Sequence, residues 1–170
     1  EFRESANYAL LNATYNYLSD ECLNVGKNYK LTYSLTKDNR FYWRYDNKKD
    51  TIPIKSPDMV DKLGKLIIYD CLCEHGLFDV LRLNKLYIDY LKEKGIVESP
   101  VLKVLNVEGK ELLSTGNLNK EFSSIITVPV DLGYKYQHQI IAIFELPFIF
   151  RALSGILWVE LIFMIGFIFC

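Results

Sequence analysis

The sequence lacks the residue patterns on which common catalytic and cofactor sites are built. It contains no G-x-S-x-G, no H-E-x-x-H, no Walker phosphate loop and no G-x-G-x-x-G. Its only histidines are His75 and His138, and neither can be matched with a nucleophile into a catalytic pair. We therefore predict that this chain is non-catalytic and binds no cofactor and no metal ion.

An excess of charge of one sign is also missing. Lys and Arg together number 20, Asp and Glu number 21, and the net charge is −1. Proteins that bind nucleic acid usually carry a basic excess, so we expect no nucleic-acid partner and no polybasic membrane patch. Aromatic residues are plentiful, with 12 Tyr and 10 Phe, and this argues against intrinsic disorder.

Charged residues are almost absent from positions 152–170 (ALSGILWVELIFMIGFIFC), where Glu160 is the only one and proline does not occur. The Leu, Ile, Val and Phe side chains of this segment favour membrane insertion by about 3 to 7 kcal/mol, against a penalty of about 2 to 3.5 kcal/mol for one carboxylate. The segment is apolar on every side, which disfavours a buried core helix. It therefore predicts a C-terminal transmembrane helix.

All the other charged residues except Arg151 come before Phe150. Residues 1–146 have about the size of one folded domain, so we predict an extracytoplasmic domain over 1–146 and a junction with the transmembrane helix over 147–170. The sequence begins without methionine and shows no signal peptide or earlier membrane span. We expect it to be part of a longer membrane protein.

The cysteines do not form an obvious disulfide or metal pattern. Cys170 falls in the hydrophobic segment, which leaves Cys22, Cys71 and Cys73. On a helix Cys71 and Cys73 point about 200° apart and cannot bridge each other. Pairing of one of them with Cys22 stays open, whereas a metal site with His75 is disfavoured because Cys73 lies off the shared face. Buried thiols are the simplest expectation.

The first part of the chain has helical periodicity. Two apolar rows repeat at spacings of three and four and predict a helix over 5–25 that ends at Gly26. The first row is Tyr8, Leu11, Tyr15, Leu18, Cys22 and Val25, and the second is Phe2, Ala6, Leu10, Ala13 and Tyr17. Either one row covers the core while the other meets a partner chain, or both are buried within the domain.

The apolar period changes to two beyond this helix. Residues 29–36 and 41–46 alternate between apolar and polar side chains around a turn at 37–39, which predicts a β-hairpin. The polar run that follows, 47–50 (NKKD), is interpreted as a solvated loop.

Two further helices are predicted in the middle of the chain. Ser56-Pro57-Asp58 is a typical helix start, and helical spacing continues to about Glu74, where His75-Gly76 ends the helix with a capping cation. A second helix is expected to start at Asn84 as its cap and to end at Lys94-Gly95.

Strand patterns then follow one another without an intervening helix. We predict strands over 101–107, 110–115, 122–130 and 134–144, with turns at 108–109 and 131–133. Pro129 cannot donate to a sheet ladder and is expected at a strand end or bulge. This order predicts an α+β fold in which helices cover one face of an antiparallel sheet.

The same order resembles the extracytoplasmic PAS-like (Cache-type) sensor domains of membrane histidine kinases, especially those of Bacteroidetes. Residues 81–96 (LRLNKLYIDYLKEKGI), followed by SPVLKVLNVEGKEL, look like their short helix, strand and D/E-x-G turn. Residues 141–170 look like their last strand, aromatic-proline junction and second membrane span. The resemblance implies a PAS-like antiparallel sheet with a long N-terminal helix and two covering helices, followed by a C-terminal transmembrane helix.

The resemblance also implies a function. The domain would sense a small molecule or protein stimulus and pass a conformational change through its last strand to the second membrane helix of a two-component sensor histidine kinase. It implies a bacterial inner-membrane protein with residues 1–146 in the periplasm, and a homodimer formed through the N-terminal and transmembrane helices. The kinase region would lie beyond Cys170. The alternative is a membrane-anchored interaction module without a kinase, using the tyrosine-rich hairpin as its contact surface.

PAS-like sensors hold ligands between the concave face of the sheet and the covering helices. Lys103, Tyr136 and His138 lie on the predicted strands and are the candidate ligand-binding residues. The simpler interpretations, a hydrogen-bonded sheet histidine and a solvated strand lysine, stay open.

Overall fold

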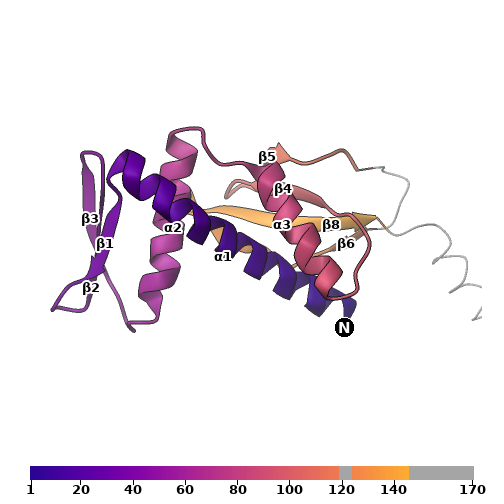
Figure 1. Ribbon diagram of the computed structural model, residues 1–170, viewed down its shortest axis with the longest axis horizontal. Helices are drawn as coiled ribbons and strands as arrows, with labels where there is room; N and C mark the ends of the chain where they lie inside the picture. Colours follow the sequence, from indigo (N-terminus) through magenta and orange to yellow (C-terminus); the bar gives the residue numbers. More distant parts are fainter. Residues whose placement is uncertain (119–123, 146–170) are drawn as a thin grey trace, which may run out of the picture.

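The protein is α+β, and a computed structural model describes residues 1–118 and 124–145. Within these residues lie three helices and two antiparallel sheets, as Figure 1 shows. The helices are α1 (Phe2–Tyr29), α2 (Met59–Glu74) and α3 (Val80–Glu93). The predicted fold class is confirmed at this level.

The helix α1 is longer than the predicted range of 5–25. Gly26 lies inside it, and the left-handed residue that ends the helix is Lys30, with φ 53°. A glycine inside a helix costs about 1 kcal/mol relative to alanine. Packing outweighs this cost, because Tyr29 in the added turn stacks on His75 with a ring-centroid distance of 3.8 Å.

The two apolar rows of α1 have different environments. The second row is largely buried, and its small Ala6 and Ala13 are fully buried among the residues of the core. Tyr87 of α3 donates a hydrogen bond to the Ala6 carbonyl at 3.2 Å, which fixes α3 against α1. The first row is partly exposed to solvent at its N-terminal end, where Tyr8 is 57% exposed and Leu11 is 37% exposed.

The smaller sheet consists of β1 (Thr32–Leu35), β2 (Arg40–Tyr45) and β3 (Lys48–Pro53) in the order β1-β2-β3. The predicted hairpin is confirmed, but its first strand begins at Thr32 rather than at Tyr29, which is the last residue of α1. The predicted loop over 47–50 is wrong, because β3 pairs with β2 after a tight turn in which Asp46 has φ 47°. Polar residues are compatible with a strand here because one face of this sheet is open to solvent.

Both central helices begin away from their predicted caps. In α2 the N-cap is Asp58 rather than Ser56. In α3 the cap is Asp79, whose Oδ1 accepts the backbone N–H groups of Leu81 and Arg82 at 2.9 and 3.0 Å. Asn84 therefore lies inside α3. The predicted ends at His75-Gly76 and Lys94-Gly95 are confirmed.

The larger sheet has the strand order β5-β4-β8-β6, with β7 also paired to β8. Its strands are β4 (Val101–Leu105), β5 (Glu111–Ser114), β6 (Ser124–Ile126), β7 (Val130–Leu132) and β8 (His138–Glu145). The predicted strand over 122–130 is interrupted within its described part, since β7 begins after Pro129. Residues 131 and 132 belong to β7 rather than to a turn. The turn starts at Gly133, which has φ 79°.

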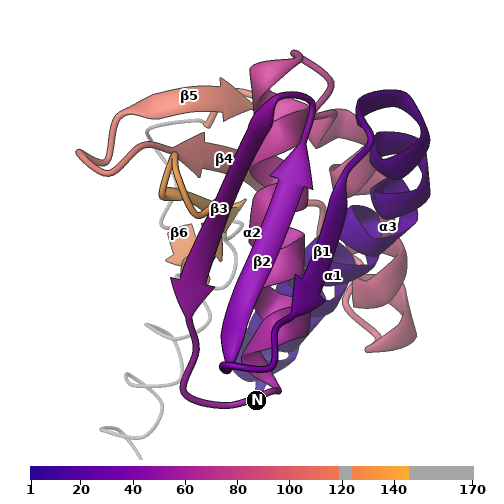
Figure 2. The same ribbon diagram turned by 90° about the vertical axis from the view of Figure 1, so that its left-hand side faces the viewer.

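The helices lie between and beside the two sheets (Figures 1 and 2). The inner face of the larger sheet contributes Leu102, Val104, Ile140, Ala142 and Phe144 to one core with α1 and α3. The helix α2 contacts β1 and β2 on one side and β7 on the other. The helix α2 therefore lies between the two sheets and contacts both.

The membrane prediction falls outside the residues that the structure describes. Among residues 1–118 and 124–145, no helix has the length and apolar character needed to cross a bilayer. The predicted transmembrane segment, 152–170, and its junction lie beyond this range.

Candidate functional site

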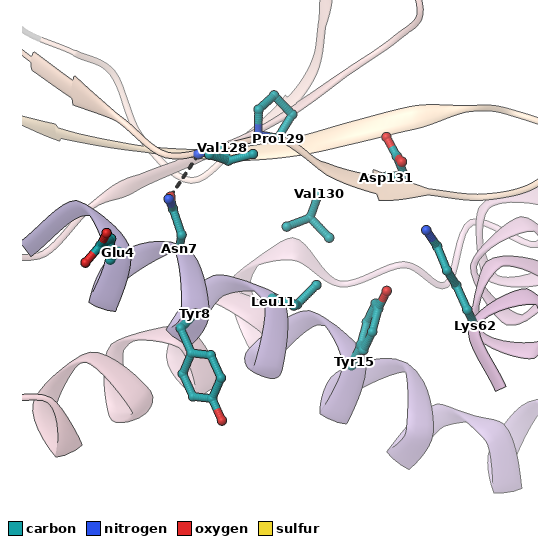
Figure 3. Close-up of a pocket in the computed structure, with 10 residues that line it drawn as sticks. All are labelled: Glu4, Asn7, Tyr8, Leu11, Tyr15, Lys62, Val128, Pro129, Val130 and Asp131. Atoms are coloured by element: carbon teal, nitrogen blue, oxygen red, sulfur yellow. Dashed lines mark hydrogen bonds between the residues drawn. The ribbon is translucent and has the colours of Figure 1, made fainter. Parts of the chain in front are cut away.

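The candidate site is a groove between α1 and the segment that leads into β7. We call it the α1–β7 groove; it encloses about 510 Å³, a volume in the range of small-molecule sites. Leu11 of α1 and Val130 of β7 face each other across it (Figure 3). Its lining is Glu4, Asn7, Tyr8, Leu11, Tyr15, Lys62, Val128, Pro129, Val130 and Asp131.

Polar groups lie at both ends of this groove (Figure 3). At one end Asn7 accepts the backbone N–H of Val128 through Oδ1 at 2.9 Å, which ties α1 to the edge of the sheet. At the other end lie Lys62, Tyr15 and Asp131. Burial, together with the carboxylates of Asp61 and Asp131, raises the pKa of Tyr15, so its hydroxyl stays protonated as a donor. An apolar floor with polar ends suits a small, partly apolar molecule.

A second hollow adjoins this groove. We call it the α2–β8 hollow; it encloses about 450 Å³ and shares Lys62 and Asp131 with the groove. Its other lining residues are Leu66, Val107, Gly133, Tyr134, Gln137, His138 and Gln139. The first two residues of β8 thus line a space that begins where the groove ends.

His138 is held at the wall of this hollow by α2. The hydroxyl of Tyr69 lies 2.8 Å from its Nδ1, and the two rings meet edge to face. Burial raises the pKa of Tyr69, so the phenol keeps its proton and forms a hydrogen bond with the imidazole, whose tautomer sets which of the two groups donates. Burial also lowers the pKa of His138, although the Asp70 carboxylate opposes this shift. The lowered pKa of His138 favours a neutral imidazole at neutral pH.

Asp70, the next residue of α2, holds the turn before β8. Its carboxylate accepts the backbone N–H groups of Tyr134, Lys135 and Tyr136 at 2.9, 2.8 and 3.3 Å. Burial raises the pKa of Asp70, and the three N–H donors work in the opposite direction. Gly133 allows this approach, because a Cβ at that position would run into Oδ1 of Asp70.

The structure brings two of the three predicted ligand-binding residues together. His138 lines the hollow, and the Tyr136 ring lies against it with a centroid distance of 5.4 Å. Lys103 lies elsewhere. Its neighbours on β4 point into the core, so alternation places Lys103 on the opposite face, where it pairs with Glu111 at 2.6 Å.

Sequence reasoning missed the residues that line the α1–β7 groove. Lys62, Asn7 and Asp131 are single polar residues in elements of ordinary composition, and no spacing distinguishes them. Asp70 did carry a signal, because it is an acidic residue inside an otherwise apolar helical segment.

The thiols and titratable groups give no sign of metal chemistry in the described part of the chain. Cys22, Cys71 and Cys73 are free thiols there, and burial raises the pKa of Cys71 to about 11. No group of three His, Cys, Asp or Glu side chains within residues 1–118 and 124–145 is arranged to hold a metal ion.

Comparison with known proteins gives no family assignment. The sequence matches no protein-family model and no curated protein, and the fold matches no solved structure.

Proposed function

We propose that this chain is the stimulus-sensing, extracytoplasmic PAS-like domain of a membrane sensor histidine kinase, and that the α1–β7 groove receives the stimulus. The observation that carries the proposal is the path of β8. This strand begins at the α2–β8 hollow with His138 and ends at Glu145, where the chain continues toward the hydrophobic segment at 152–170.

The contacts of α2 support a coupling between groove and strand. Lys62 lies at the groove, while Tyr69 and Asp70 hold His138 and the turn that precedes β8. A ligand that prefers one position of α2 would shift β8 with it. Such a shift carries only as much free energy as the ligand distinguishes between the two positions.

The N-terminal and transmembrane helices would form a homodimer, as the resemblance to membrane sensor kinases implies. In this proposal the protein is anchored in the bacterial inner membrane with residues 1–146 in the periplasm. The full protein would then continue beyond Cys170 into a kinase region with a phosphorylated histidine.

The alternative of an anchored interaction module using the tyrosine-rich hairpin has less support. In the described hairpin, Tyr45 is fully buried and the Trp43 ring stacks on it, so most of the aromatic area serves the fold.

A chimeric receptor tests the sensing proposal. The chain would be placed between a first membrane helix and a cytoplasmic histidine-kinase core, and autophosphorylation would be measured in membranes. Leu11→Trp fills the α1–β7 groove and should change kinase output severalfold. Leu23→Trp on the same helix is the control, because Leu23 is 72% exposed and is not among the groove residues.

With two residues inserted after Pro147, Leu11→Trp should no longer change kinase output, although the domain stays folded. Equal output from the Leu11 and Leu23 variants, with no effect of the insertion, would contradict the proposal.

A further inference from the structure

The small sheet has two faces of different chemistry. Phe41 and Tyr45 of β2 are buried against the core, so strand alternation directs Arg40, Tyr42 and Arg44 to the other face. The register adds the neighbours of these three residues on the flanking strands. This outer face consists of Thr32, Ser34, Arg40, Tyr42, Arg44, Lys49, Thr51 and Pro53.

The outer face of the small sheet is basic. None of its eight residues, all of them in the described part of the chain, is acidic. Residues 30–55 contain seven Lys and Arg but only three Asp and Glu, although the whole chain has a net charge of −1. Figure 2 shows this sheet turned toward the viewer, with no other element in front of it. The charge of the chain is therefore unevenly distributed.

Two of these cations are adjacent and uncompensated. Arg44 on β2 is paired in register with Lys49 on β3, and both side chains are exposed. Neither makes an ion pair or a side-chain hydrogen bond with any residue that the structure describes. Like charges directly opposite each other destabilise a strand pair, so the fold alone gives no reason to keep them.

We propose that the outer face of the small sheet binds a linear acidic polysaccharide. Guanidinium groups bind carboxylates or sulfates through paired N–H donors, and the exposed Thr and Ser hydroxyls can hydrogen-bond sugar hydroxyls. The ring of Tyr42 lies between Arg40 and Arg44 along the strand and offers an apolar surface for the face of a sugar.

Other polyanionic partners fit this face less well. A protein interface has an apolar core, and the described outer face has no Leu, Ile, Val, Phe or Trp. Single-stranded nucleic acid stacks successive bases on several aromatic rings, and Tyr42 is the one aromatic residue among those eight. The small sheet lies at the opposite end of the molecule from the end of β8 (Figure 1), which places it away from a membrane entered through the C-terminal segment. This last step rests on the proposed function.

Binding to polygalacturonate tests the inference. The full 170-residue chain, held in a non-ionic detergent, would be titrated with this polymer by calorimetry at low and high salt. We expect binding that weakens at high salt and is absent with the fully methyl-esterified polymer, which keeps the sugars and loses the charge. Absence of binding to polygalacturonate at low salt would overturn the proposal. Tighter binding to oligo(dT) would also overturn it.

Matched double variants locate the site. Arg44→Gln with Lys49→Gln should weaken polygalacturonate binding about tenfold, since two surface charge contacts are lost. The control is Lys85→Gln with Lys110→Gln, which removes the same charge from exposed residues of α3 and the β4–β5 turn. Equal weakening by both pairs would refute a specific site.

Two further measurements keep this site separate from folding and from the sensing proposal. Removal of the opposed charges should leave the melting temperature of the double variant unchanged or higher. Leu11→Trp should leave polymer binding unchanged, because the groove and the small sheet share no residue. A kinase chimera that fails to respond to Leu11→Trp would therefore count against the sensing proposal but not against the polysaccharide site.

Discussion

The small sheet rests on α2 through aromatic rings, whereas the large sheet is tied to the same helix through a buried carboxylate. On the small-sheet side, the Tyr33 ring packs so close to Gly64 that a Cβ there would lie 2.8 Å from it. On the large-sheet side, Asp70 accepts three backbone N–H groups from the turn before β8. Ring packing tolerates small shifts, but a set of directional hydrogen bonds does not.

The polar contacts that α2 makes with the two sheets differ in the same sense. Near its C-terminal end α2 meets the small sheet through partly exposed polar contacts. Glu74 pairs with Lys48 and accepts a hydrogen bond from the Tyr45 hydroxyl, and Nε2 of His75 lies 3.2 Å from a carboxylate oxygen of Asp46. Surface pairs of this kind contribute little to stability. We infer that α2 is held firmly to β8 and loosely to the small sheet, so a movement of α2 would carry β8 with it.

The largest expected effect is on the β8 side, at Gly133. Gly133→Ala adds a Cβ 2.9 Å from Cδ1 of Tyr69 and still closer to Asp70, at a residue with φ 79°. Backbone strain and the clash together should lower the free energy of unfolding by about 3 kcal/mol or more, measured by urea denaturation.

Gly109→Ala is the control for strain alone, because Gly109 has φ 76° and no atom within 4 Å of the added Cβ. We expect it to cost about 1 kcal/mol. Equal losses for the two variants would show that the approach of Asp70 to Gly133 is unimportant.

The next effect is expected from Asp70 itself. Asp70→Ala leaves the N–H groups of Tyr134, Lys135 and Tyr136 without their acceptor, and stability should fall by about 2 kcal/mol. The loss is limited because burial of this carboxylate is itself unfavourable, as the direction of its pKa shift indicates. Asp70→Asn keeps one acceptor oxygen, so its stability should lie between those of the wild type and Asp70→Ala. If Asp70→Ala unfolds at the same urea concentration as the wild type, α2 is not firmly held to β8.

A smaller effect is expected on the small-sheet side, at Gly64. The three atoms nearest to the Cβ added by Gly64→Ala are Cζ, Cε2 and Oη of Tyr33, the far end of a side chain that is not fully buried. The ring can move aside, so we expect a loss of about 1 kcal/mol. Tyr33→Leu in the same chain should remove most of that loss, and a double-mutant cycle measures the coupling. A loss as large as that of Gly133→Ala would contradict the contrast between the two sides.

Sequence periodicity is sufficient to predict the elements whose apolar residues are the ones buried in the fold. The hairpin, the C-terminal ends of α2 and α3, and the strands β4 and β5 were predicted at or near their observed positions. The last strand was predicted from 134, but β8 begins at His138, so Tyr136 lies in the preceding turn. Predictions failed where tertiary contacts decided the outcome. The helix α1 continues past Gly26 because Tyr29 packs on His75. Residues 48–50 of the polar run belong to β3 because β2 offers them a partner.

The candidate site could be predicted only in part, for a related reason. His138 and Tyr136 were identified because a strand pattern placed them on the helix-covered face. Lys103 was placed with them without fixing which face of β4 it occupies, and a shift of one residue reverses that face. The α1–β7 groove combines side chains from three separate segments, and no local pattern encodes such a meeting.

The smallest predicted effect is the pH dependence contributed by His138. Its pKa is lowered from the ordinary value of 6.5 by burial, so between these two pKa values the unfolded chain binds a proton that the folded chain does not. Stability is therefore fully present above about 6.5 and falls as the pH decreases toward the lowered pKa. His138→Gln should remove this part of the slope in thermal unfolding followed from pH 7.5 to 5.5. The side chain is only half-buried, and solvent screening keeps the effect small. An unchanged slope in the variant would show that burial does not hold the imidazole neutral, and would weaken the case that α2 packs closely against the start of β8.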